Sequence, residues 1–199
     1  MSKNQKPSSL IMICFTTDIE LYRPMTIIRH YLINEECTNV KYKEEGVDFN
    51  HTLNSDYQFH FKYLEILSVD NPNSKCNLAD SYLIFLNLEK EEIYEQMDSI
   101  LNFIQNNGNS EKKIFVVGLY INSTNIKEEY NEEKVKEYLD QQKFNFEYSE
   151  INFDSTNELI KIIDFISTET IKNKKESNKN ENDNNEQENG QSGSKCFIF

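Results

Sequence analysis

Short runs of apolar residues alternate along the chain with segments in which apolar residues recur every three or four positions. Three of these runs are almost continuously apolar: residues 10–15, 82–86 and 114–119. Such runs are typical of strands that are covered on both faces of a parallel sheet. We therefore expect these three segments to form the centre of a parallel sheet.

A short polar break separates two further segments that are rich in β-forming residues. Residues 47–53 and 57–67 flank Asn54, Ser55 and Asp56, which are residue types that favour a turn. This pattern predicts an antiparallel hairpin. Residues 144–149 are expected to form one more strand.

Four segments show the spacing of an amphipathic helix, in which one apolar stripe faces the sheet. The stripes consist of Met25, Ile28 and Leu32; of Ile93, Met97, Ile100, Leu101 and Ile104; of Val135, Tyr138 and Leu139; and of Leu159, Ile162, Ile163 and Ile166. We expect Ser155 to cap the last helix and Glu158 to reach back to the Ser155 amide. Together the elements predict an α/β fold with a mainly parallel six-stranded sheet, helices on both faces and one antiparallel edge strand.

Composition limits the classes of partner. The chain of 199 residues has a net charge of -13, so we expect no nucleic-acid partner, because phosphate backbones are bound by clustered Lys and Arg. No stretch approaches the roughly 20 apolar residues of a membrane-spanning helix, and no leader segment is expected. Residues 1–9 are expected to be a disordered N-terminus and residues 171–195 a flexible polar tether, which leaves 10–170 as the folded domain.

No arrangement typical of a metal site occurs in the sequence. The four cysteines, at positions 14, 37, 76 and 196, lie far apart without a CxxC pair, and the three histidines lack the i, i+4 spacing of a helical metal pair. Asp18 and Glu20 are neighbours without further ligands of known spacing, and such carboxylates are usually solvated. We expect no metal and no cofactor.

The last four residues, Cys196, Phe197, Ile198 and Phe199, have the form of a CaaX prenylation signal. The terminal Phe199 favours a geranylgeranyl group on Cys196, with removal of residues 197–199 and methylation of the cysteine. We expect attachment to the cytoplasmic face of the plasma membrane or an endomembrane, in exchange with the cytosol, because one lipid chain alone binds reversibly. A prenyltransferase and a prenyl-binding chaperone are the expected partners of this segment.

Three stretches resemble the Rab branch of the Ras-like small GTPases. Gly46, Val47, Asp48 and Phe49 are identical to the GVDF stretch that opens the second strand in Rab-type proteins. Residues 114–118 look like the strand that leads to the guanine-reading NKxD motif, and residues 146–149 like the strand that enters the SAK motif. The resemblance implies a small-GTPase fold of the P-loop NTPase type, with an effector-binding face on the hairpin that includes Gly46 to Phe49.

Five nucleotide-binding motifs of this family have lost a central residue. A phosphate loop needs glycines, whose backbone amides surround the phosphates, and a Lys that adds positive charge. By the resemblance, the phosphate-loop positions hold Phe15, Glu20, Leu21 and Tyr22, the switch positions hold Glu44, Ser68 and Asn71, and the NKxD and SAK positions hold Leu119, Tyr120, Asn122 and Ser149. Ser149 keeps the family's residue type, whereas Asp18 and Glu20 would repel a triphosphate.

The resemblance therefore predicts a prenylated, Rab-like pseudo-GTPase that acts without enzymatic activity, through an unknown effector protein, in vesicle traffic or signalling. One alternative is a divergent but working GTP hydrolase that holds GTP or GDP with Mg²⁺. The other is an unrelated flavodoxin-like binding domain, for which the hairpin and the Gly46–Phe49 stretch would be coincidental. Five parallel strands without an antiparallel partner would favour that last alternative.

Overall fold

The structure is a computed structural model that describes residues 8–15, 28, 38–43, 46–50, 58–65 and 75–189. The strands in these ranges are β1 (Ser8–Phe15), β2 (Thr38–Lys43), β3 (Gly46–Asn50), β4 (Gln58–Glu65), β5 (Ser81–Asn87), β6 (Ile114–Tyr120) and β7 (Phe146–Asn152). The α-helices are α2 (Ile93–Asn107), α3 (Glu132–Asp140) and α4 (Thr156–Asn189), and the short 3-10 helices are η2 (Lys75–Leu78), η3 (Ser123–Asn125) and η4 (Glu128–Tyr130).

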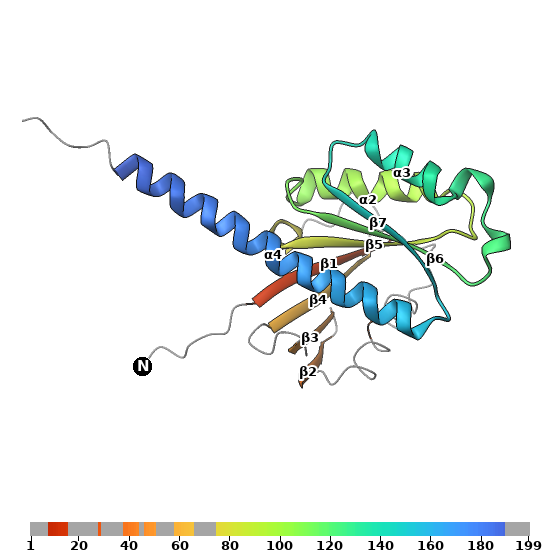
Figure 1. The fold of residues 1–199 in the computed structure, drawn as a ribbon, viewed down its shortest axis with the longest axis horizontal. Coiled ribbons are helices and arrows are strands. Elements are labelled where there is room, and N and C mark those ends of the chain that lie inside the picture. The colour runs from red at the N-terminus through yellow and green to blue at the C-terminus, as the bar shows by residue number, and fades with distance from the viewer. Residues whose placement is uncertain are drawn as a thin grey trace, which may run out of the picture.

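One twisted sheet holds all of these strands, in the order β2-β3-β4-β1-β5-β6-β7 (Figure 1). The strands from β4 to β7 in this order run parallel to one another. β3 pairs antiparallel with β4, and β2 pairs antiparallel with β3. The α/β class and the mainly parallel sheet are thus confirmed. The sheet has seven strands where the sequence predicts six, because β2 adds a strand outside β3 and takes the edge position.

The hydrophobic pattern of the sequence does not predict β2, because few residues of this strand are apolar. Its sequence is TNVKYK, in which half-buried Val40 packs against the core and Lys41 is exposed. An edge strand can be built from so few apolar residues because only part of its surface is covered. β1 also begins at Ser8, two residues inside the segment predicted to be disordered.

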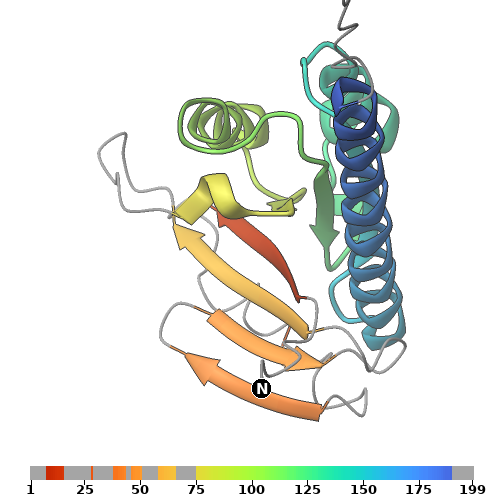
Figure 2. The same cartoon turned by 90° about the vertical axis from the view of Figure 1, so that its left-hand side faces the viewer.

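The central strands are covered on both faces, as their apolar runs predict. In β5 and β6 every residue except the last is buried. One face, around Ile11 and Ile13 of β1, packs against α4, and the other packs against α2 and α3. Figure 2 shows α2 and α4 on opposite faces of the sheet, so helices cover both sides.

The predicted helical stripes of α2, α3 and α4 are buried, except that Tyr138 of the α3 stripe is only half-buried. α2 buries Ile93, Met97, Ile100, Leu101, Phe103 and Ile104, α3 buries Val135 and Leu139, and α4 buries Leu159, Ile162, Ile163 and Ile166. Ile28 is buried in the same core cluster as the α4 stripe. Met25 and Leu32 lie outside the described residues, as does the predicted turn at 54–56.

α4 begins at its predicted cap. The Glu158 amide donates to Ser155 Oγ at 3.4 Å, which fits Ser155 as the residue that precedes the first turn. The Glu158 carboxylate does not reach back to the Ser155 amide, because that amide already donates to the Asn152 carbonyl at 3.0 Å. Glu158 Oε2 instead accepts from the Asn152 amide at 2.9 Å.

The C-terminal end of α4 differs from the predicted tether. The helix continues to Asn189 and projects beyond the sheet (Figure 1), although a flexible segment is predicted from residue 171. Residues 156–189 contain neither Gly nor Pro, and Gly190 follows directly. Lys, Glu and Gln are good helix formers, so a segment without apolar residues can still extend an anchored helix. No helix in the described ranges is long and apolar enough to cross a bilayer.

Candidate functional site

The carboxyl ends of the parallel strands meet along one edge of the sheet, which is where open α/β sheets usually bind ligands. The strand register sets Asn87 of β5 beside Leu119 of β6, and Tyr120 of β6 beside Asn152 of β7. The residues that follow these strands therefore converge. We call Glu89, Ile121, Asn122 and Asn152 the rim.

Leu119 and Tyr120, at the predicted NKxD position, connect neighbouring strands through their carbonyl groups. The Leu119 carbonyl accepts from the Leu88 amide at 2.9 Å, and the Tyr120 carbonyl accepts from the Phe153 amide at 2.8 Å. The Leu119 side chain is buried in the core. Both residues therefore serve the sheet itself in the positions where the resemblance implies base-reading residues.

Asn122 caps the short helix that follows β6. Its Oδ1 atom accepts from the Thr124 amide at 3.1 Å and from Thr124 Oγ1 at 2.9 Å. An Asn at this position satisfies amide donors at a helix start that have no partner within the helix. The Asn122 oxygen, at the position where the resemblance implies a guanine-reading residue, thus accepts hydrogen bonds within the loop.

Glu89 holds the same loop from the side of β5. Its Oε1 atom accepts from the Asn122 amide at 2.7 Å and from the Ile121 amide at 3.2 Å. A carboxylate that accepts two backbone amides forms charge-assisted hydrogen bonds, which are stronger than neutral ones. The sequence analysis does not single out Glu89. The only signal is an acid two residues after the end of a buried strand.

Asn152 connects the rim to β7 and α4. Its Nδ2 atom donates to the Ile121 carbonyl at 3.2 Å, and its Oδ1 atom accepts from the Asp154 amide at 2.9 Å. The Asn152 amide donates to Glu158, as described above. The polar groups of the rim therefore bind one another and the nearby backbone.

Ser149 lies away from the rim. Ser149 lies within β7, three residues before the strand ends at Asn152, and it pairs with Val117 of β6. The resemblance implies that this serine enters a loop at the sheet edge, but the register instead sets Ile151 opposite Leu119. The structure therefore does not bring Ser149 together with Asn122.

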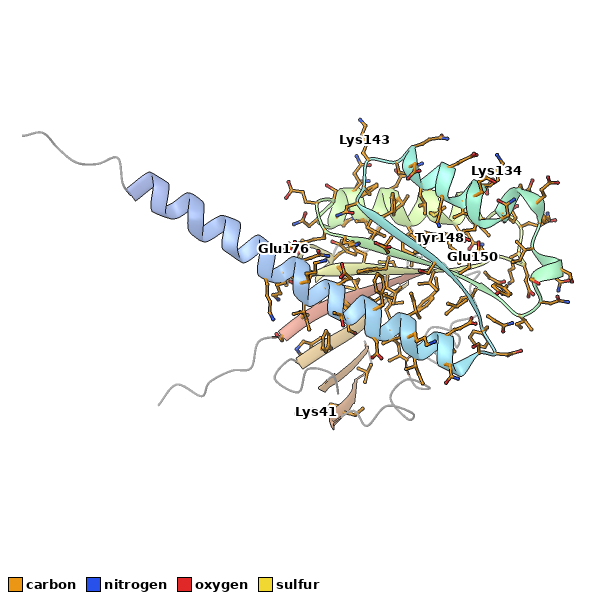
Figure 3. The ribbon with its side chains drawn as sticks, viewed as in Figure 1. Lys41, Lys134, Lys143, Tyr148, Glu150 and Glu176 are labelled. Atoms are coloured by element: carbon orange, nitrogen blue, oxygen red, sulfur yellow. The ribbon has the colours of Figure 1, made fainter. Side chains whose placement is uncertain are left out.

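Half-buried Tyr148 and Glu150 form a second polar group on the α3 side of β7 (Figure 3). Tyr148 Oη donates to Glu150 Oε1 at 2.9 Å. Burial raises the pKa of Glu150 above its ordinary value, and nearby Glu132 raises it further. Burial and the Glu150 carboxylate also raise the pKa of Tyr148, so the phenol keeps its proton. Tyr148 packs against the core cluster that includes Val135 and Leu139 of α3, so the pair lies where β7 and this helix meet.

The remaining predicted positions are described in part or not at all. Phe15 is the last residue of β1, and its backbone alone is described; the same is true of Gly46, Asp48 and Phe49 in β3. Val47 is buried in the core, so its side chain is not part of an exposed effector face. The other predicted positions lie outside the described residues: Asp18, Glu20, Leu21, Tyr22, Glu44, Ser68, Asn71 and Cys196 to Phe199.

Within the described ranges, no group of three or more His, Cys, Asp or Glu side chains is arranged to hold a metal ion. Three oxygens of the rim, Glu89 Oε1, Asn122 Oδ1 and Asn152 Oδ1, each accept from a nearby backbone amide. Comparison with protein-family models and with curated proteins finds no match for this chain.

Proposed function

We propose that this chain is a Rab-like pseudo-GTPase that acts by binding other proteins. The strand arrangement supports the proposal: β3 runs antiparallel beside five parallel strands, with helices on both faces. This arrangement favours a small-GTPase-like fold over the flavodoxin-like alternative, which would lack the antiparallel partner.

The state of Asn122 carries the proposal. Reading guanine requires an acidic acceptor for the hydrogen atoms of the base, and this position holds an amide whose oxygen already accepts twice from Thr124. Glu89 Oε1 accepts from the backbone amides of Asn122 and Ile121, at 2.7 and 3.2 Å. The Asn122 oxygen caps the short helix at residues 123–125, and a bound base would have to replace that interaction. The position is therefore specialised for loop structure.

Thermal unfolding of the purified full chain tests this proposal. A ligand at about 100 times its Kd stabilises the folded state by about 2.7 kcal/mol, which for a chain of this size raises the melting temperature by about 5–10 °C. We expect no shift with GDP or GTP plus Mg²⁺, relative to Mg²⁺ alone. A saturable shift with GDP would refute the proposal in favour of a divergent GTPase.

We further propose that a geranylgeranyl group on Cys196 attaches the chain to a membrane. The sequence supports this through Cys196 in the fourth position from the end and Ile198 in the third position of a CaaX ending. A prenyltransferase would add the group, and a prenyl-binding chaperone would carry the chain between membranes. Lys172 to Lys179 lie far from Cys196 and are offset by acids between 176 and 188, so attachment is reversible.

Fractionation of cells that express the full chain tests the lipid. Mass spectrometry is expected to find a prenyl group on Cys196, and Cys196→Ser is expected to move the protein to the soluble fraction. Cys37→Ser is the matched control and is expected to leave the distribution unchanged. Membrane association that survives Cys196→Ser would contradict the lipid anchor without bearing on the loss of nucleotide binding.

A further inference from the structure

Within residues 157–176 of α4, the two halves contact the sheet in different ways. The first half buries the apolar stripe from Leu159 to Ile166. In the second half, from Ser167 to Glu176, Ile171 is the one apolar residue. The fully buried polar side chains of the described residues gather at this second half: Ser167 and Thr170 of α4, with Ser9 of β1 and Ser81 of β5.

The hydroxyl groups of this contact are incompletely paired. Ser81 Oγ and Thr170 Oγ1 lie 2.8 Å apart, and Thr170 Oγ1 also donates to the Ile166 carbonyl at 2.8 Å. Ser9 Oγ and Ser167 Oγ are buried without a hydrogen-bond partner among the described residues. A buried hydroxyl without a partner loses the hydrogen bonds that it makes in water, which weakens the contact.

Charged groups supply the remaining attachment. Lys174 Nζ donates to Asp80 Oδ2 and to the Ser8 carbonyl, each at 2.7 Å. Asp80 Oδ2 also accepts from the Leu10 amide at 2.9 Å. The Lys174 and Asp80 side chains are 30% and 15% exposed, so the pair is partly open to solvent and is screened by salt less than a fully exposed pair.

A second charged contact lies nearby. Lys113 Nζ, just before β6, is 3.8 Å from Glu169 of α4 and 2.8 Å from Glu147 of β7. A surface pocket of about 210 Å³ is lined by Asp80, Lys113, Asn173 and Lys174, among others. Residues 167–176 are therefore attached by charged groups, by hydroxyls and by the single buried side chain of Ile171, whereas residues 157–166 are attached by a full apolar stripe.

We propose that residues 167–176 of α4 form a releasable strap, which leaves the sheet in a local opening while residues 157–166 stay packed. Screening of the Lys174–Asp80 and Lys113–Glu169 pairs weakens the strap, but it does not weaken burial of the apolar stripe. Release exposes the buried hydroxyls of Ser9 and Ser81 to solvent. It also changes the direction in which the segment after residue 176 extends from the domain.

Hydrogen exchange of the full chain, followed by mass spectrometry, tests the strap. Raising sodium chloride from about 0.05 M to about 1 M shortens the Debye length to about 3 Å. We expect the protection of amides 167–176 to fall several-fold, with little change in 157–166. Equal changes in the two halves, or no change in either, would overturn the proposal.

Two matched variants distinguish loss of the Lys174 contact from loss of one positive charge. At low salt, Lys174→Ala is expected to lower protection in 167–176 about tenfold, as the loss of hydrogen bonds from a charged group implies. Lys172→Ala removes the same charge, but its ammonium lies 3.5 Å from Glu169 of the same helix and is expected to change little. Equal effects of the two variants, or loss of protection in 157–166 with Lys174→Ala, would also overturn the proposal.

Discussion

Gly118 in the middle of β6 gives a direct test of how the side chains of Tyr148 and Leu88 pack against this strand. It pairs with Leu86 of β5 and Glu150 of β7 and is buried. A Cβ atom at this position would lie 2.7 Å from Tyr148 Oη and 2.8 Å from a Leu88 methyl carbon. Because both distances are far below normal contact, Gly118→Ala requires neighbouring side chains to move.

The expected cost follows from the crowding. Extra atoms in a close-packed core typically cost about 1–3 kcal/mol, and replacing Gly by Ala within a strand returns about 0.5–1 kcal/mol of backbone entropy. The net loss is about 0–2.5 kcal/mol, which corresponds to a fall in melting temperature of up to about 10 °C for a chain of this size. We therefore expect Gly118→Ala to unfold at a lower temperature and a lower urea concentration.

A double-mutant cycle identifies the atom responsible. Tyr148→Phe removes the nearest clashing oxygen and, alone, costs about 1 kcal/mol through the lost bond to Glu150. In the Tyr148→Phe background, Gly118→Ala is expected to cost less than in the natural chain, with the remaining cost due to Leu88. An unchanged or larger cost in that background, or stabilisation by Gly118→Ala alone, would refute the packing described here.

Three further outcomes are expected from the same unfolding assays. Gly108→Ala is expected to destabilise the chain even with Tyr82→Phe, because the new Cβ also meets the Ile104 carbonyl at 2.8 Å, and backbone cannot move aside; rescue by Tyr82→Phe would contradict this. Burial raises the pKa of the Glu150 carboxyl above the ordinary Glu value of 4.5. The folded state therefore loses stability as the pH rises above 4.5, because this carboxyl ionises less readily in the folded chain than in the unfolded chain. Glu150→Gln is therefore expected to raise the melting temperature at pH 7, with the gain lost near pH 4; a gain that persists there would contradict the sign. Deletion of residues 178–189, which contain no apolar side chain, is expected to leave the melting temperature unchanged, and a clear fall would show a contact of this segment with the domain.

The elements with a strong apolar signal were predictable from sequence. The runs at 82–86 and 114–119 are β5 and β6, because strands buried on both faces can contain few polar residues. The stripe from Ile93 to Ile104 is the buried face of α2, since its spacing matches the helical period. These signals are local and depend on which residues are apolar, which a single sequence states directly.

The missed features depend on pairing across the fold. β2 contains alternating polar residues, so its place at the edge is fixed by pairing with β3. The strand register moves Ser149 into the sheet, and register is set by partners that are distant in sequence. Glu89 can bind the loop after β6 because β5 and β6 end side by side. The two residues of the Glu89–Ile121 hydrogen bond are 32 positions apart in the sequence. The helical course of 171–189 also lacks an apolar signal in the sequence.

The nucleotide content of the full chain as isolated tests the proposed loss of GTP chemistry most directly. The protein would be purified in buffer with Mg²⁺ and without added nucleotide, then denatured, and the released nucleotides quantified by chromatography per mole of protein. The Asn122 side-chain oxygen is bonded to Thr124, and the backbone amides of Ile121 and Asn122 are bonded to Glu89. We therefore predict no guanine nucleotide in the released fraction. One GDP or GTP per protein molecule would contradict the proposal that this chain is a pseudo-GTPase.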